Sequence, residues 1–175
     1  MTSRDCPHLK AKIREIIDFP TAGIKFKDIT PLLEDKVAFR ETIDCFSDFF
    51  RDSRADKIVG IDARGFLLAA PVAYILNTGM VIVRKKGKLP YAKILREHDL
   101  EYGRGSLEIH VDAIKRGERI LIIDDVLATG GTAEAAVKLV EDLGGHVIGL
   151  GFLLELSMNG RELLKNYEIK SLLKY

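Results

Sequence analysis

The sequence predicts an α/β protein with a central, mostly parallel sheet flanked by helices. After residue 56, short apolar runs alternate with helical patterns, which is typical of βαβ units. Runs such as Ile-Leu-Ile-Ile at 120–123 have no polar alternation, as expected of strands that helices cover on both faces. The length of 175 residues is close to what one hydrophobic core fills, so we expect one domain over residues 1–175.

The N-terminal third is expected to contain two amphipathic helices. Apolar side chains recur at helical spacing over residues 9–17 and again over residues 39–50. Between them, residues 18–31 are rich in turn formers and too long for a simple connection. Long ordered loops of this kind usually carry function, so we expect this one to contribute to a site.

The remaining elements follow in alternation. The expected strands are residues 57–61, 80–83, 119–123 and 146–154, and the expected helices are residues 66–76 and 131–143. The second of these helices has one apolar stripe and ends before Gly144-Gly145. Residues 85–109 are polar, with several glycines and weak periodicity, which favours a mobile hairpin or lid.

Composition and charge exclude several classes of protein. Hydrophobic residues make up 47% and charged residues 30% of the chain, which excludes disordered and low-complexity classes. A net charge of +1 gives no general attraction to nucleic acid or an anionic membrane. The longest uncharged apolar run is about half the ~20 residues that a membrane span requires. The charged N-terminus is unlike a signal peptide, so we expect a cytoplasmic protein that binds neither nucleic acid nor membrane.

The most informative segment runs from Ile120 to Thr132. It contains an apolar strand, the acidic pair Asp124-Asp125, a loop of small residues and the start of a helix. Ligands of open α/β sheets lie at the carboxyl ends of strands. Two adjacent carboxylates can accept hydrogen bonds from the 2′- and 3′-hydroxyls of ribose and balance a bound cation.

The loop that follows suits an anion. Its residues are Ala128, Thr129, Gly130, Gly131 and Thr132. Successive N–H groups at a helix N-terminus attract negative charge, so the segment predicts a sugar phosphate. The alternative is a plain βα turn with a threonine cap. The sequence lacks both GxxxxGK[ST] and GxGxxG, which disfavours an NTPase or a dehydrogenase.

Two further segments can bind anions. Arg84, Lys85, Lys86 and Lys88 place four positive charges within five residues, although such a run is most often a solvated turn. The segment Asp62-Ala63-Arg64-Gly65 opens a predicted helix, so its arginine and the helix N-terminus can hold a phosphate group. The alternative is that Asp62 caps the helix and Arg64 is exposed.

Together these segments resemble the type I phosphoribosyltransferase family, and most closely its adenine-specific members. The resemblance rests on residues 120–132 and on the segments 18–21, 62–66, 84–90, 101–103 and 160–163. It implies a hood over the base formed by residues 1–35, a flexible lid at about 85–109 and a homodimer. It also implies Mg²⁺ as cofactor, held mainly by substrate and water, with Asp124 or Asp125 as the candidate protein ligands.

The resemblance further implies the reaction of adenine with phosphoribosyl pyrophosphate to give AMP and pyrophosphate, a step of purine salvage. The acidic pair would bind ribose, and the loop 128–132 would bind the 5′-phosphate. Pyrophosphate would contact Ala63, Arg64, Arg84, Lys85 and Lys88, with Arg64 also counted as catalytic. Phe26 would stack on adenine, whose edge would meet backbone groups of Lys25 and Lys27. Glu101 would act as general acid or base, with Tyr102 beside it.

Two alternatives stay open at the level of the sequence. The chain can be a phosphoribosyltransferase for another base, such as hypoxanthine, guanine, xanthine or orotate. A 6-oxopurine site usually presents a side-chain donor to O6, and none is obvious here. The chain can also be a non-catalytic sensor of phosphoribosyl pyrophosphate, although its length and charge leave no room for a DNA-binding module.

Overall fold

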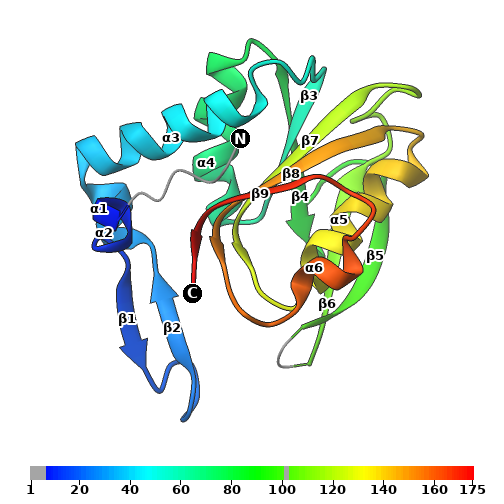
Figure 1. Ribbon diagram of the computed structural model, residues 1–175. Coiled ribbons are helices and arrows are strands. Elements are labelled where there is room, and N and C mark those ends of the chain that lie inside the picture. The colour runs from blue at the N-terminus through cyan, green and yellow to red at the C-terminus, as the bar shows by residue number, and fades with distance from the viewer. Residues whose placement is uncertain (1–6, 101–102) are drawn as a thin grey trace.

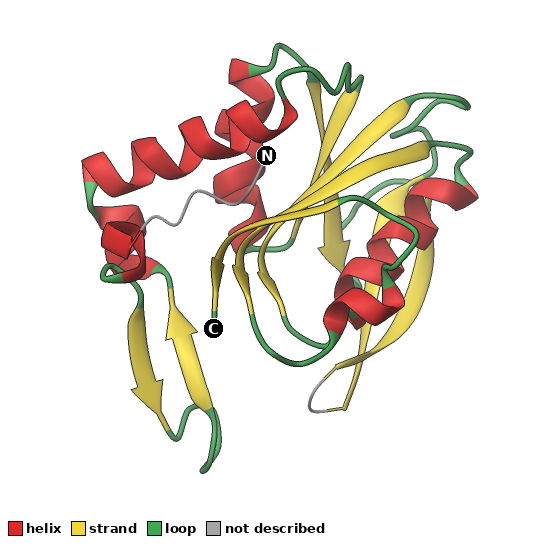
Figure 2. Cartoon of the chain, in the orientation of Figure 1, coloured by secondary structure: helices red, strands yellow, loops and turns green. Residues whose placement is uncertain are grey.

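The computed structural model describes residues 7–100 and 103–175 and confirms the α/β fold class (Figure 1, Figure 2). Its helices are α1 (Pro7–Lys10), α2 (Thr30–Glu34), α3 (Lys36–Phe50), α4 (Arg64–Ile75), α5 (Gly131–Asp142) and α6 (Gly160–Leu163). Its strands are β1 (Arg14–Ile17), β2 (Lys25–Asp28), β3 (Lys57–Ile61), β4 (Gly79–Lys85), β5 (Lys93–Leu100), β6 (Gly103–His110), β7 (Arg119–Leu127), β8 (His146–Glu155) and β9 (Ile169–Lys174). The four strands and two helices predicted after residue 56 are thereby confirmed.

Seven strands form the main sheet in the order β5-β6-β4-β3-β7-β8-β9. From β4 to β9, neighbouring strands run parallel, whereas β5 and β6 form an antiparallel hairpin that joins β4 through β6. This hairpin lies where the sequence predicts a hairpin or lid; its mobility stays a prediction. Figure 1 shows β1–β2 and the β5–β6 hairpin extending beyond the carboxyl-end edge of the parallel strands.

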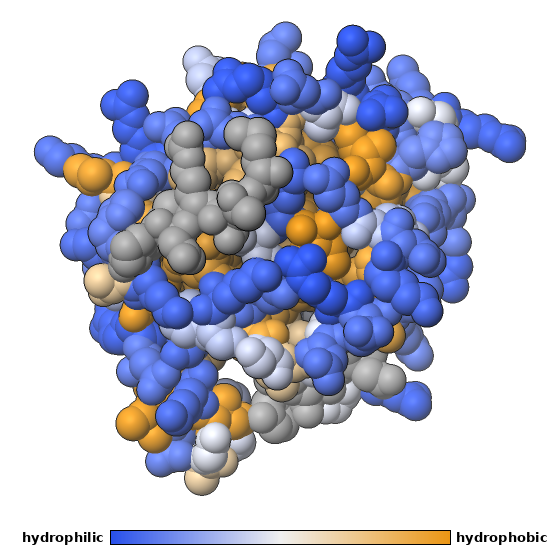
Figure 3. Space-filling model, in the orientation of Figure 1, coloured by the Kyte–Doolittle hydropathy of each residue, from blue (hydrophilic) through white to orange (hydrophobic). Residues whose placement is uncertain are grey.

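The core consists of two apolar layers, one on each face of the sheet. Buried residues of α3 and α4 pack on one face with Leu121 and Ile123 of β7, and α5 packs on the other with Ile120 and Ile122. Adjacent residues of a strand point to opposite faces, so both layers need apolar residues from β7. Figure 3 shows hydrophilic side chains over most of the displayed face, with hydrophobic areas visible between them, mainly in its upper part. No helix within residues 7–100 and 103–175 is long and apolar enough to cross a membrane.

The packing defines where a ligand is expected. α4 follows β3 on one face, and α5 follows β7 on the other. β3 and β7 are neighbours, but the chain leaves β3 toward one face of the sheet and leaves β7 toward the other. The crevice between their carboxyl ends is the switch point where open α/β sheets bind ligands.

The predicted helix over residues 9–17 is wrong. α1 ends at Lys10, and residues 14–17 form β1, which pairs antiparallel with β2. Isoleucine favours strands through its branched Cβ, and strand pairing with residues 25–28 overrides the helical spacing. The predicted loop over residues 18–31 therefore contains a strand and the start of α2.

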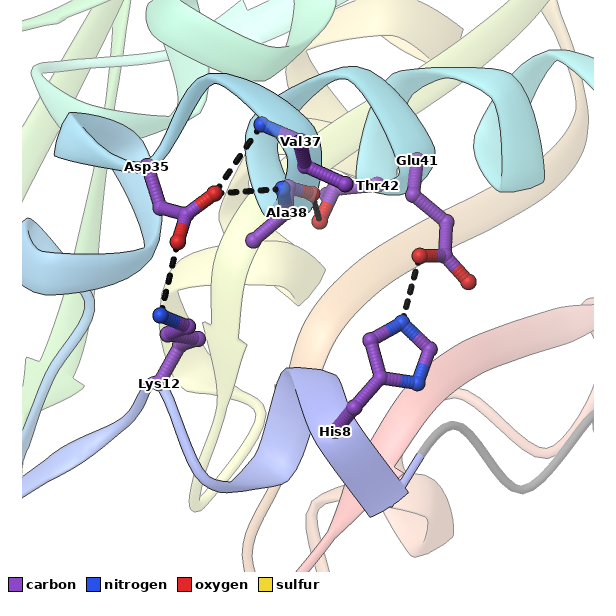
Figure 4. A network of polar contacts seen from close by, with 7 residues as sticks. All are labelled: His8, Lys12, Asp35, Val37, Ala38, Glu41 and Thr42. Carbon is purple, nitrogen blue, oxygen red and sulfur yellow. Dashed lines mark hydrogen bonds and ion pairs between the residues drawn. The ribbon is translucent and has the colours of Figure 1, made fainter.

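The second predicted helix is confirmed as α3, and Asp35 fixes its start. The Asp35 Oδ1 atom accepts hydrogen bonds from the N–H groups of Val37 at 2.9 Å and Ala38 at 3.1 Å (Figure 4). Lys12 Nζ lies 2.6 Å from Asp35 Oδ2, and His8 contacts Glu41 one turn further along. The segment before β1 is thus attached to α3 by polar contacts.

We expect Asp35→Ala to lower the melting temperature at pH 7 and to have a smaller effect in acid. The hydrogen bond from Lys12, and then those from the Ala38 and Val37 N–H groups, lower the pKa of Asp35 to about 2. A carboxylate whose pKa is lower in the folded state stabilises that state above its unfolded pKa of about 3.9, and the contribution is lost as the pH falls. Thermal unfolding at pH 7 and at pH values from about 4 down to about 2 measures the effect, with the exposed Asp112→Ala as control. An equal decrease at every pH would contradict the charge-based explanation.

Candidate active site

Two arginines connect segments near the carboxyl ends of β3, β4 and β7. The Nε atom of Arg64, the first residue of α4, lies 2.8 Å from Asp125 Oδ2. Arg84, in β4, donates from Nε to Asp62 Oδ2 at 3.1 Å. The structure therefore brings together the basic segment, the 62–65 segment and the acidic pair.

The 62–65 segment differs from the simple cap considered as its alternative. The N-cap of α4 is Ala63, which makes no side-chain capping bond, and the Asp62–Ala63 peptide is cis. Asp62 instead accepts the hydrogen bond from Arg84. Ala63 is exposed, so its surroundings are open to a ligand.

The acidic pair lies within β7 rather than after it. The strand continues to Leu127 because its pairing with β8 extends to Leu127 opposite Glu155. Asp124 and Asp125 are only 8% and 6% exposed, and the Asp125 N–H donates to Asp124 Oδ1 at 2.9 Å. Burial, and next the charge of Asp125, raise the pKa of Asp124 well above its ordinary value. A ligand that donates hydrogen bonds to the pair would compensate these buried acceptors.

The loop 128–130 connects the acidic pair to α5, a helix of 12 residues. The N-cap of α5 is Gly130 at φ 90°, so the threonine cap considered as an alternative is wrong. A Cβ atom on Gly130 would lie 2.5 Å from the Gly160 carbonyl oxygen, and one on Gly160 would lie 2.3 Å from the Ala128 carbonyl oxygen. The loop thus packs directly against the backbone at the start of α6, which fixes its shape at the helix N-terminus.

A cavity of about 420 Å³ lies beside this loop. It is lined by Thr129 and Gly131, by residues of α5 and α6, and by Glu97 and His98 of β5. The β5–β6 hairpin therefore reaches the loop that is predicted to bind phosphate. A larger cavity, of about 860 Å³, lies between α3 and β9 and contains none of the predicted site residues.

The β1–β2 ribbon supplies an aromatic side chain to the same region. The guanidinium carbon of Arg64 lies 5.4 Å from the centre of the Phe26 ring, and Phe19 packs edge-on against Phe26 at 5.2 Å. The alternation of β2 places the side chains of Lys25 and Lys27 on the opposite face, where both lie near Glu15. Only the backbone groups of these lysines are thus available on the Phe26 side.

Several predicted residues stand apart from these contacts. Lys85 and Lys88 are exposed beside Arg84, and Thr132 is half-buried in the first turn of α5. Glu101 and Tyr102 lie outside the described residues. Within residues 7–100 and 103–175, no group of three or more His, Cys, Asp or Glu side chains is placed to hold a metal ion.

Sequence reasoning missed the role of two residues that support the site. Gly160 gives no local signal, because its contact with the 128–130 loop is between segments distant in sequence. Glu108 lies between two apolar residues of β6, a pattern that predicts a solvent-facing side chain. It is instead fully buried.

The fold and these loops define a phosphoribosyltransferase. Residues 32–174 match the family model described as "Phosphoribosyl transferase domain", and the chain belongs to this family. The match spans every parallel strand of the sheet, the 62–65 segment and the loop that begins α5.

Its relatives within the family include adenine phosphoribosyltransferases. The chain is 57% identical over 169 residues to the enzyme of Alkaliphilus metalliredigens, covering 96% of this chain and 99% of the relative. The crystal structure of the enzyme of Thermoanaerobacter pseudethanolicus superposes with a TM-score of 0.94 at 51% identity, over 97% and 99% of the two chains. That of Saccharomyces cerevisiae, solved with adenine and an imino-altritol bisphosphate, has a TM-score of 0.89 at 37% identity, over 95% and 97% of the chains.

Proposed function

We propose that this chain transfers the phosphoribosyl group of phosphoribosyl pyrophosphate to adenine, forming AMP and pyrophosphate in purine salvage. The observation that carries the proposal is the contact series Phe26, Arg64, Asp125. It connects an aromatic surface for a base to the acidic pair for ribose, next to the phosphate loop. The adenine phosphoribosyltransferases among its relatives support adenine as the base.

Each part of the substrate has a chemically matched partner. The 5′-phosphate would lie on the loop 128–132, where N–H groups begin α5. The ribose hydroxyls would donate to Asp124 and Asp125. Pyrophosphate would meet Arg64, Arg84 and the exposed Lys85 and Lys88, together with the backbone at Ala63.

The chemistry is displacement at the anomeric carbon through an oxocarbenium-like transition state, related in charge distribution to glycoside hydrolysis. Holding phosphate and ribose at fixed points orients the reacting carbon. Arg64 and Arg84 would stabilise the charge that grows on the departing pyrophosphate. Glu101, which follows β5, would exchange a proton with N7 of the base, and the hairpin over residues 85–109 would exclude water.

The residues present fit a magnesium ion held mostly by the substrate. Two adjacent carboxylates, Asp124 and Asp125, supply the oxygen ligands that Mg²⁺ prefers. When bound, Mg²⁺ neutralises negative charge on the pyrophosphate. We expect the activity to be lost in excess chelator and restored by added Mg²⁺.

The base specificity is tested by incubating the protein with Mg²⁺, phosphoribosyl pyrophosphate and adenine, hypoxanthine, guanine, xanthine or orotate. Chromatography of the products is expected to show AMP from adenine and no nucleotide from the other bases. Nucleotide formed from another base would support the phosphoribosyl site but contradict the proposed role of residues 1–35 in binding adenine. Binding of phosphoribosyl pyrophosphate without any product would favour a sensor. A homodimer stays a prediction that light scattering can test.

We expect Phe26→Ala to raise the KM for adenine about tenfold, because stacking of a base on an aromatic ring contributes about 1–3 kcal/mol. The KM for phosphoribosyl pyrophosphate should change much less, because Phe26 is proposed to contact the base and not the phosphoribosyl group. Steady-state kinetics with each substrate varied in turn measures both values. Phe26→Tyr keeps the ring and serves as control. An unchanged KM for adenine would remove the stacking role.

A further inference from the structure

A buried carboxylate lies beneath the basic turn, by which we mean residues 84–89. Glu108, on β6, is 0% exposed. Its Oε1 atom accepts hydrogen bonds from the N–H groups of Lys88 at 2.8 Å and Leu89 at 2.6 Å, and its Oε2 atom accepts one from the Gly87 N–H at 3.1 Å. Three successive backbone donors of the turn therefore converge on one side chain.

We propose that Glu108 is a positioning residue for pyrophosphate: it holds the basic turn in the shape that presents Arg84, Lys85 and Lys88 to the substrate. The proposal rests on the proposed function, because it assigns the pyrophosphate contacts to this turn. Glu108 itself touches no reacting atom.

The charges of the turn explain why it needs such a support. Four cations within five residues repel one another, and their repulsion favours an extended, mobile segment. A carboxylate beneath them offsets part of this repulsion, and its hydrogen bonds to N–H groups are of the strong, charge-assisted kind. The turn is thereby fixed before a ligand arrives, which lowers the entropy lost on binding.

Among the described residues, three N–H donors and one cation lie close to the Glu108 carboxylate. The cation is Lys93 of β5, whose Nζ atom lies 3.9 Å from Oε2. Burial raises the pKa of Glu108, but the N–H groups of Leu89, Gly87 and Lys88 and the charge of Lys93 outweigh it, so the pKa is lowered. The side chain is therefore a carboxylate at neutral pH.

The basic turn also holds the side chain of Arg84 in place. The Lys88 carbonyl oxygen accepts a hydrogen bond from Arg84 Nη1 at 3.3 Å, while Arg84 Nε binds Asp62. In the β4–β6 pairing, Arg84 lies opposite Glu108. A turn that loses its support would thus also release the arginine that connects it to the 62–65 segment.

The test separates pyrophosphate binding from the rest of the site. Glu108→Gln removes the negative charge and replaces one accepting oxygen with a donating NH₂ group. We therefore expect the KM for phosphoribosyl pyrophosphate to rise about tenfold or more, and the inhibition constant of pyrophosphate to rise by a similar factor. The KM for adenine and the dissociation constant of AMP, which carries no pyrophosphate, should change less than about twofold. Glu34→Gln, the same change at an exposed residue of α2, should alter none of these values.

A second variant keeps the test decisive if Glu108→Gln does not fold. Gly87 has φ +83°, and a Cβ atom there would meet nothing within 4 Å, so Gly87→Ala strains only the turn. We expect the same selective rise, smaller in size, with an unchanged circular dichroism spectrum. Equal weakening of AMP and pyrophosphate, or no change in pyrophosphate binding, would overturn the proposal. If the wild type makes no AMP, the proposed function fails, and calorimetric binding of pyrophosphate alone still decides the role of Glu108.

Discussion

Asp125→Asn is expected to reduce kcat/KM for phosphoribosyl pyrophosphate by a factor of ten or more. The carboxylate is almost fully buried and lies 2.8 Å from Arg64 Nε. An amide accepts weaker hydrogen bonds from the ribose hydroxyls and leaves the arginine without its anionic partner. Hydrogen bonds to charged groups contribute about 1.5–3 kcal/mol, which corresponds to a factor of about ten to one hundred.

Steady-state kinetics at several concentrations of phosphoribosyl pyrophosphate measures this loss. The control is Asp112→Asn, the same change at an exposed residue. A variant as active as the wild type would show that the acidic pair does not bind ribose.

Gly160→Ala is expected to weaken the binding of both phosphoribosyl pyrophosphate and AMP. We expect kcat/KM to fall by about a hundredfold, because overpacking costs about 1–3 kcal/mol or more. The added Cβ would lie 2.3 Å from the Ala128 carbonyl oxygen. This contact is with backbone, so no side-chain rotation relieves it, and the 128–130 loop must move. Both ligands carry the 5′-phosphate that this loop is proposed to hold.

The loss of AMP binding distinguishes Gly160→Ala from Glu108→Gln, which should affect only ligands that contain pyrophosphate. Calorimetric titration with AMP measures it directly. Gly117→Ala is the control: it strains the backbone at φ +87°, but its Cβ would meet nothing within 4 Å, so AMP binding should be unchanged. Normal AMP binding by Gly160→Ala would mean that the phosphate lies elsewhere.

The sequence predicts well those helices and strands whose burial follows from their own pattern of apolar residues. The unbroken apolar run at 120–123 and the apolar stripe of α5 both follow from burial between two layers. The strand β1 could not be predicted, because only its pairing with residues 25–28 decides between strand and helix. The length of β7 likewise depends on β8, which places the acidic pair inside the strand.

The candidate site likewise contains residues that local sequence patterns predict and contacts that they do not. The residues Asp124, Arg64 and Arg84 are recognisable because each belongs to a short local motif: an acidic pair after an apolar run, a helix start, or a cluster of basic residues. The contacts that connect them, such as Arg64 with Phe26, join segments distant in sequence. Glu108 follows an alternating pattern that predicts exposure, and only the folding of the basic turn over it creates its burial.

The central claim is that one site at the switch point of the sheet binds base, ribose and phosphate in that order from Phe26 to α5. A crystal structure of the protein with AMP tests it most directly. We predict the phosphate on the N–H groups of residues 128–132, the ribose hydroxyls on Asp124 and Asp125, and adenine against Phe26. AMP bound elsewhere, or with its phosphate on the basic turn and its base over the 128–132 loop, would contradict the account.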